Sequence, residues 1–84
     1  MKVLRMISVY EKIGDKLIVE INIDNISIIA LKHIISYDVD DPNLFKLYKI
    51  TAAYYNKLVK LVPELSKFDL DTVEMFLECY QARS

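Results

Sequence analysis

The single glycine of the chain, Gly14, stands between two stretches that have the hydrophobic pattern of β-strands. Gly14 and Asp15 form a Gly-Asp pair, which is typical of tight turns. In Lys16–Ile23, after this pair, hydrophobic residues recur at every second position, the period of a half-buried strand. Val3–Glu11, before it, also fits a strand. We therefore expect the N-terminal part of the chain to form an antiparallel β-hairpin.

A symmetric turn would pair Glu11 with Lys16, and opposite charges stabilise such a cross-strand pair. The same register aligns six hydrophobic residues on one face, which we expect to face the core: Leu4, Met6 and Tyr10 with Ile23, Ile21 and Leu17. The second face also carries several hydrophobic residues: Val3, Ile7, Val9 and Ile18. Because a solvated face does not need so many, we expect the second face to be covered by a partner or by a second copy, as a homodimer.

Two later segments have hydrophobic residues at spacings of three and four, which is typical of amphipathic helices. The first is Ile26–Ser36, and either Asp24 or Asn25 can cap its amino end. The second begins after Thr51, another suitable cap, and runs to about Val62 because the proline that follows disfavours helical geometry there. We expect a loop between the two helices, with a possible short strand near its end.

Residues 72–82 fit two patterns. The spacing of Val73, Phe76, Leu77 and Tyr80 fits a helix, whereas the alternation from Val73 to Cys79 fits a strand. Two strands alone rarely form a stable sheet, so we favour a third strand here. The expected fold is one α+β domain over residues 1–84. Its small antiparallel sheet, formed by the N-terminal hairpin and a C-terminal strand, packs against two helices.

Composition narrows the classes of function. Hydrophobic residues make up 54% of the 84 residues and the net charge is −1, so the chain is not of a disordered type and has no basic excess for nucleic acid. No stretch approaches the roughly eighteen apolar residues that span a bilayer, and no signal peptide is evident. Cys79 has no partner for a disulfide. We therefore expect a soluble cytoplasmic protein with neither a nucleic-acid nor a membrane partner.

Candidate catalytic and metal-binding residues are few. His33 and Cys79 are each the only residue of their type, and no glycine-rich turn offers an oxyanion hole beside them. A calcium loop starting at Asp38 would need Gly and Glu where Asn43 and Lys49 stand. We therefore expect no enzyme activity, no catalytic residue, no metal site and no cofactor.

The charged residues are grouped unevenly, in two acidic clusters: Asp38, Asp40 and Asp41, and Asp69, Asp71, Glu74 and Glu78. Such clusters are either solvated surface or a docking face that attracts a basic partner and selects it. On the second interpretation Tyr37 and Tyr80 are candidate anchors, because exposed aromatic residues contribute strongly to interfaces.

Short motifs resemble a small bacterial protein family. They are Leu17–Ile21 in the hairpin, Asp40–Pro42, Tyr48–Thr51, the pair Phe68–Asp69, and the tail Phe76–Tyr80. Proteins of this kind are similar to the immunity proteins encoded beside polymorphic or contact-dependent toxins. The resemblance implies stoichiometric binding that neutralises a cognate toxin domain. The alternative is a small structural or regulatory module that self-associates through its sheet.

Overall fold

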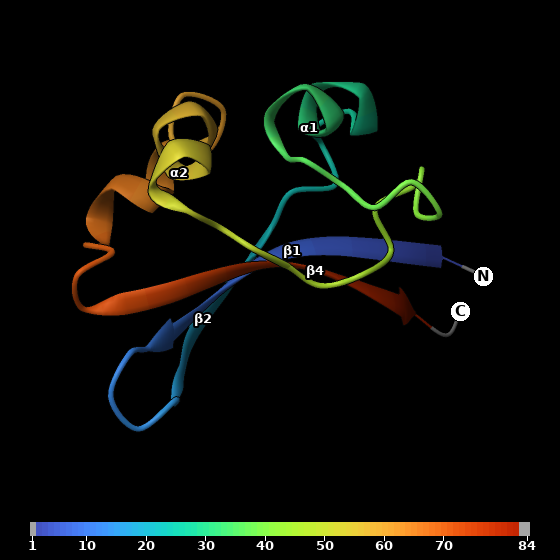
Figure 1. Cartoon of the computed structure of the whole chain (residues 1–84). Helices are drawn as coiled ribbons and strands as arrows, with labels where there is room; N and C mark the ends of the chain where they lie inside the picture. The colour runs from blue at the N-terminus through green and yellow to red at the C-terminus, as the bar shows by residue number, and fades with distance from the viewer. Residues whose placement is uncertain (1, 83–84) are drawn as a thin grey trace.

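The strands of the sheet lie in the order β2-β1-β4-β3, and all neighbours are antiparallel. In the computed structural model, which describes residues 2–82, the strands are β1 (Lys2–Glu11), β2 (Leu17–Asn22), β3 (Tyr48–Lys49) and β4 (Val73–Ala82). The long strands β1 and β4 pair along their whole length in the centre of the sheet. The first and last strands in chain order thus form its middle (Figure 1).

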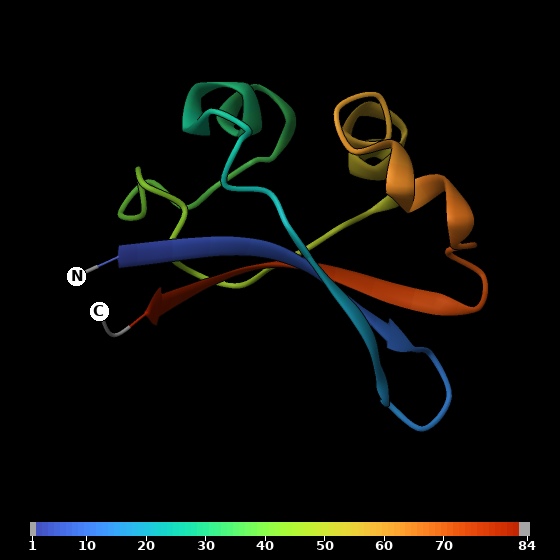
Figure 2. The same ribbon diagram turned by 180° about the vertical axis from the view of Figure 1, so that it is seen from behind.

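The helices lie together on one face of this sheet, as opposite views show (Figures 1 and 2). They are α1 (Ile28–Ile34), α2 (Ala52–Leu58) and the 3-10 helix η1 (Pro63–Lys67). Within the described residues, no helix covers the other face. The expected α+β class, with an antiparallel sheet packed against two helices, is confirmed.

The start of α1 differs from the expected one. Its cap is Ser27, whose hydroxyl oxygen accepts a hydrogen bond from the backbone N–H of Ala30 at 3.1 Å. Asp24, one of the expected caps, instead accepts a hydrogen bond from the backbone N–H of Arg5 at 2.8 Å. This hydrogen bond holds the segment after β2 against β1, so Asp24 is not available as a helix cap. The helix therefore begins at Ile28, later than the expected Ile26.

The cap of α2 is the expected one, because Thr51 accepts a hydrogen bond from the backbone N–H of Tyr54 at 3.3 Å. The helix is shorter than expected and ends at Leu58 rather than near Val62. A turn follows, and Pro63 begins η1, as proline suits the first position of a helix.

A bulge shifts the register of the hairpin. Tyr10 pairs with Leu17, as the symmetric turn predicts, but the next position of β2, Ile18, has no partner on β1. The remaining pairs are displaced by one residue, so that Ile7 pairs with Ile21. Because side chains alternate between the two faces, this shift exchanges the faces of one strand relative to the other.

The prediction of which residues face the core is therefore correct at the end of β2 and wrong in β1. Ile21 and Ile23 are buried, but Leu17 is 44% exposed. The β1 residues predicted for the core, Leu4, Met6 and Tyr10, are only partly buried. They lie on the face without helices, since their neighbours Ile7 and Val9 point to the helices.

The prediction that the second hairpin face needs a partner is wrong for its central residues. Ile7 and Val9 are fully buried in the core of the chain itself, whereas Ile18 is 44% exposed. The four residues thus do not form one exposed surface.

The segment 72–82 is a strand, as its alternation predicts. Val73, Met75 and Leu77 of β4 are buried beneath the helices, with exposed fractions of 6%, 0% and 1%. Leu31 of α1 and Leu58 of α2 are fully buried in the same core. The core therefore lies in one layer between the helices and the sheet.

Candidate functional site

The face of the sheet away from the helices carries a mixture of aromatic, hydrophobic and carboxylate side chains. Ile7 and Leu77 are paired and point to the helices, so the residues beside them on each strand point the other way. The cross-strand pairs extend this assignment to Glu20 and Lys49. By the same pairing, Leu17 and Asn22 lie on this side, and Asp15 and Leu47 border it at a pocket. We call this surface the open face: Leu4, Met6, Ser8, Tyr10, Asp15, Leu17, Glu20, Asn22, Leu47, Lys49, Glu74, Phe76, Glu78 and Tyr80.

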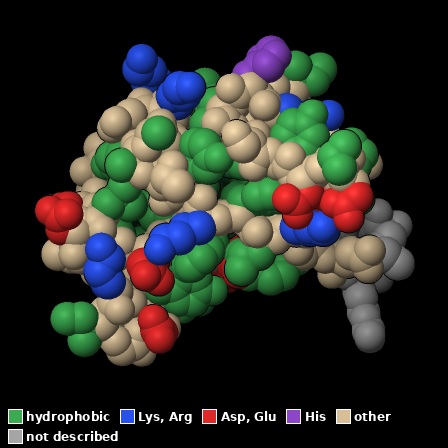
Figure 3. Space-filling model, viewed as in Figure 1, with side chains coloured by type: hydrophobic (Ala, Val, Ile, Leu, Met, Phe, Trp, Pro, Cys, Tyr) green, Lys and Arg blue, Asp and Glu red, His purple; other side chains and the backbone are tan. Residues whose placement is uncertain are grey.

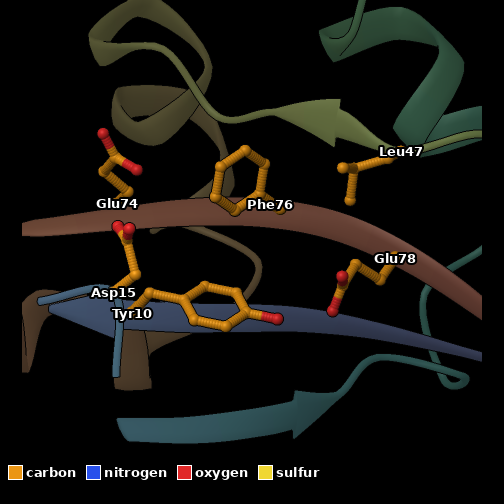
Figure 4. Close-up of a pocket in the computed structure, with 6 residues that line it drawn as sticks. All are labelled: Tyr10, Asp15, Leu47, Glu74, Phe76 and Glu78. Carbon is orange, nitrogen blue, oxygen red and sulfur yellow. The ribbon is translucent and has the colours of Figure 1, made fainter. Parts of the chain in front are cut away.

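A shallow pocket of about 240 Å³ lies on the open face (Figure 4). We call it the aromatic pocket, and its lining residues are Tyr10, Asp15, Leu47, Glu74, Phe76 and Glu78. The rings of Tyr10 and Phe76 meet edge to face, with centroids 5.8 Å apart and planes at 74°. Figure 4 shows Asp15 and Glu74 at one end of the ring pair, and Glu78 and Leu47 at the other. A hydrophobic floor is thus flanked by carboxylates.

The pocket carries an excess of negative charge. Lys49 Nζ lies 3.8 Å from Glu74 Oε1, and the Lys49 side chain is 62% exposed. Among the described residues, no other ion pair involves Asp15, Glu74 or Glu78. Figure 3 shows hydrophobic side chains at the surface on the lower, sheet side, next to charged ones. Of the three carboxylates of Asp15, Glu74 and Glu78, only that of Glu74 therefore has an ammonium group within ion-pair distance among the described residues.

Beside the pocket, two carboxylates share one hydroxyl group. Tyr80 Oη lies 2.8 Å from Glu20 Oε2 and 2.9 Å from Glu78 Oε2. The fully buried Ser8 hydroxyl also donates a hydrogen bond to Glu78. The hydrogen bond to Glu20, with burial and the bond to Glu78, raises the pKa of Tyr80, so its hydroxyl stays protonated. Because it carries one hydrogen, Tyr80 donates to one carboxylate at a time.

Two residues of the first predicted acidic cluster share one cation within the chain, which offsets one of their two negative charges. Lys46 Nζ lies 3.2 Å from Asp38 Oδ2 and 3.0 Å from Asp40 Oδ1. The hydrogen bonds to Asp40 and Asp38 raise the pKa of Lys46. Both carboxylates are largely exposed, so they remain a surface feature, but one with a cation of its own.

Asp41, the third member, holds its loop in shape. It is 5% exposed and accepts hydrogen bonds from the backbone N–H groups of Phe45 and Lys46, at 2.9 and 3.0 Å, and from the Tyr48 hydroxyl at 2.5 Å. Burial disfavours its ionised form, but these hydrogen bonds outweigh burial and lower the pKa of Asp41. Asp41 is therefore a structural carboxylate that is turned into the protein.

We expect Asp41 to make folding depend on pH. Its pKa is lower in the folded state than in the unfolded chain, so its stabilisation is present above about pH 4 and is lost as the pH falls below that value. In urea unfolding at pH 7, 4 and 2.5, Asp41→Asn should lose less stability on acidification than the wild type does. Asp38→Asn, at an exposed position, is the control. Equal acid sensitivity of the wild type and Asp41→Asn would contradict this role.

The other predicted partner-binding residues lie in three places. Asp69 and Asp71 form the turn before β4, where Asp69 Oδ1 accepts a hydrogen bond from the Asp71 N–H at 2.9 Å. Tyr37 follows α1 and is 37% exposed, and Lys32 Nζ lies 4.9 Å from the centre of its ring. Only Glu74, Glu78 and Tyr80 come together on the open face.

Sequence reasoning missed several residues of the open face. The sequence pattern places Tyr10 and Phe76 in hydrophobic stripes and Asp15 in a turn, and nothing in it marks Ser8, Glu20 or Leu47 as binding residues. The alternation of carboxylate and aromatic residues along β4, from Glu74 to Tyr80, is the signal that could have located this surface. Its pairing with Tyr10 depends on the contact between β1 and β4, which no local pattern reveals.

His33 and Cys79, the two residues considered for catalysis, lie away from the open face. Within the described residues, no set of three His, Cys, Asp or Glu side chains is arranged to hold a metal ion. His33 is exposed on α1, and burial raises the pKa of the Cys79 thiol on β4. Within residues 2–82, none of the helices has the length and hydrophobicity of a membrane-spanning segment.

These features define a two-layer α+β domain with its helices on one side and a negatively charged aromatic surface on the other. The family model described as a domain of unknown function, DUF7683, matches residues 4–78. The match covers most of the chain, so the chain belongs to this family. No curated protein and no solved structure matches it.

Proposed function

We propose that the chain is a protein-binding module that neutralises a cognate bacterial toxin by stoichiometric binding in the cytoplasm, without catalysis of its own. The open face is the proposed binding surface. The observation that carries this proposal is that residues 2–82 leave one face of the four-stranded sheet uncovered, with a pocket of aromatic residues at its surface. The sequence motifs that resemble those of immunity proteins point to the same class of function.

The composition of the open face suits an interface. Tyr10 and Phe76 provide rigid rings, and Leu47 beside them is 59% exposed. Aromatic anchors at the centre of an interface, surrounded by polar residues, contribute much of the binding free energy. Glu20, Glu74 and Glu78 form such polar surroundings here. The surface therefore combines a hydrophobic centre with charged margins.

The charge of the open face favours a basic partner. A toxin that acts on nucleic acid has a basic cleft, and carboxylates are complementary to it. Binding there would block the path of the substrate. Self-association through this face is the alternative function, but a second copy would bring Glu20, Glu74 and Glu78 of both chains together. Like charges in one interface oppose association, so we favour the toxin partner.

The test first asks whether a toxin domain is encoded next to this chain, and then co-expresses the two, with co-purification and an assay of toxin activity. We expect a stable one-to-one complex and loss of toxin activity. Leu47→Ala with Phe76→Ala should weaken binding about tenfold or more, because both changes remove anchors. The matched control is Ile29→Ala with Val39→Ala, since these residues are 65% and 97% exposed elsewhere.

Thermal unfolding of each variant shows whether the fold is retained. Equal binding by the folded open-face variant and the control would place the interface elsewhere. A complex of two copies without the toxin, measured by sedimentation over a range of concentrations, would favour self-association instead.

A further inference from the structure

We infer that the aromatic pocket receives an arginine side chain of the bound partner. This inference rests on the proposed function, because it names the partner residue that the open face recognises. The pocket, of about 240 Å³, is several times the volume of one water molecule, about 30 Å³, and its shallow form suits one extended side chain.

The carboxylates at the margins of the pocket favour a positively charged side chain as its ligand. Carboxylates stand at both ends of the ring pair, Asp15 and Glu74 at one and Glu78 at the other (Figure 4). Lys49 lies 3.8 Å from Glu74 and is mostly exposed, so it offsets only part of this charge. The Glu74 side chain is 29% exposed, and partial removal from water strengthens its attraction to a cation. A neutral side chain would add no counter-charge to the one that Lys49 supplies.

The rings between the carboxylates favour a cation with a flat head. An edge-to-face pair uses at most one face of one ring, and a cation is attracted to the face of an aromatic ring that lines a pocket. Elsewhere in the chain, two aromatic rings already have a cation beside them. Arg5 lies 5.7 Å from the centre of the Phe45 ring, and Lys32 lies near Tyr37. Within residues 2–82, no cation lies over the ring of Tyr10 or Phe76.

Arginine fits this arrangement better than lysine does. Its planar guanidinium stacks on an aromatic face and has five N–H donors in a fixed fork, which can reach carboxylates on two sides at once. Lysine offers a compact, strongly hydrated charge that contacts one side. The aliphatic part of the arginine side chain would pack on Leu47, which is 59% exposed.

The test is a titration of the isolated, isotope-labelled chain with N-acetyl-arginine methylamide, followed by NMR. We expect shifts that are localised to Tyr10, Leu47, Phe76 and Glu78. The citrulline analogue has the same shape without the charge and should give no such localised shifts. The lysine analogue should bind more weakly than the arginine analogue.

Two substitutions in the pocket test the carboxylates. Glu74→Gln and Asp15→Asn should together weaken arginine binding about fivefold. Asp15 has φ of 55°, which asparagine also tolerates, so this change should leave the turn intact. Asp69→Asn with Asp71→Asn is the matched control and should leave binding unchanged. An unaltered spectrum outside the pocket verifies the fold.

The inference is overturned by an absence of localised shifts, by equal shifts with citrulline, or by tighter binding of lysine. Because the titration needs no partner, its result is separate from that of the co-purification. A negative titration with an intact toxin complex would remove the arginine pocket and leave the proposed function. A positive titration without a toxin complex would support the pocket and remove the proposed toxin partner.

Discussion

Ile7→Ala is expected to lower the free energy of unfolding by about 2–5 kcal/mol, whereas Ile18→Ala is expected to lower it by about 1 kcal/mol or less. The two changes delete the same atoms. Ile7 is fully buried between the helices and the sheet, so its removal leaves a cavity, but Ile18 is 44% exposed. Urea unfolding of the wild type and both variants at one pH gives the two differences.

This pair of variants separates the two possible hairpins. A symmetric hairpin places Ile7 and Ile18 on the same face, so it predicts similar losses of stability. The bulge instead leaves Ile18 without a partner on β1 and places Ile7 opposite Ile21 in the core. Similar losses at the two positions would contradict the bulged register.

The class of the fold could be predicted from the sequence because its main signals are local. Gly14 and the alternation after it indicate a hairpin, and Thr51 caps the helix that it was expected to cap. The position of the bulge could not be predicted in this way. Both faces of the hairpin carry hydrophobic residues, so either register buries a hydrophobic set, and only packing against α1 and α2 selects one of them.

The strand β4 shows the limit of periodicity in a short segment. Its hydrophobic residues fit both a helix and a strand. Pairing with β1, which lies at the opposite end of the sequence, decides between them. A central strand gains hydrogen bonds on both sides, which an isolated helix of the same length does not. The expectation that a sheet needs more than two strands led to the correct choice.

The candidate site was predicted only in part, because nearness in sequence was a poor guide to nearness in space. Asp38 and Asp40 lie together in the chain, but Lys46, a few residues later, pairs with both and offsets one of their two charges. Glu20 and Tyr80 are far apart in the chain and are joined by a hydrogen bond of 2.8 Å. A cluster of like charges in a sequence can therefore be interpreted only together with the opposite charges near it. Contacts across the sheet can be predicted only when the order of the strands is known.

Neutralising the carboxylates of the open face is expected to slow association with the proposed toxin partner about tenfold at low salt. Neutralising the loop carboxylates should have little effect. The first variant combines Glu20→Gln, Glu74→Gln and Glu78→Gln. The second combines Asp38→Asn and Asp40→Asn, and Lys46 already offsets one of these two charges. A third variant, with Asp69→Asn and Asp71→Asn, tests the turn before β4.

The measurement is the association and dissociation rate of each variant at two ionic strengths. Attraction between opposite charges acts before contact and is screened over about 10 Å at 0.1 M salt. The wild type should therefore associate more slowly as salt rises, and the open-face variant should show a flatter dependence on salt. Dissociation should change less, because it depends mainly on the contacts formed after docking. If the loop variant or the turn variant is slowed while the open-face variant is not, the interface lies at that loop or turn, away from the aromatic pocket.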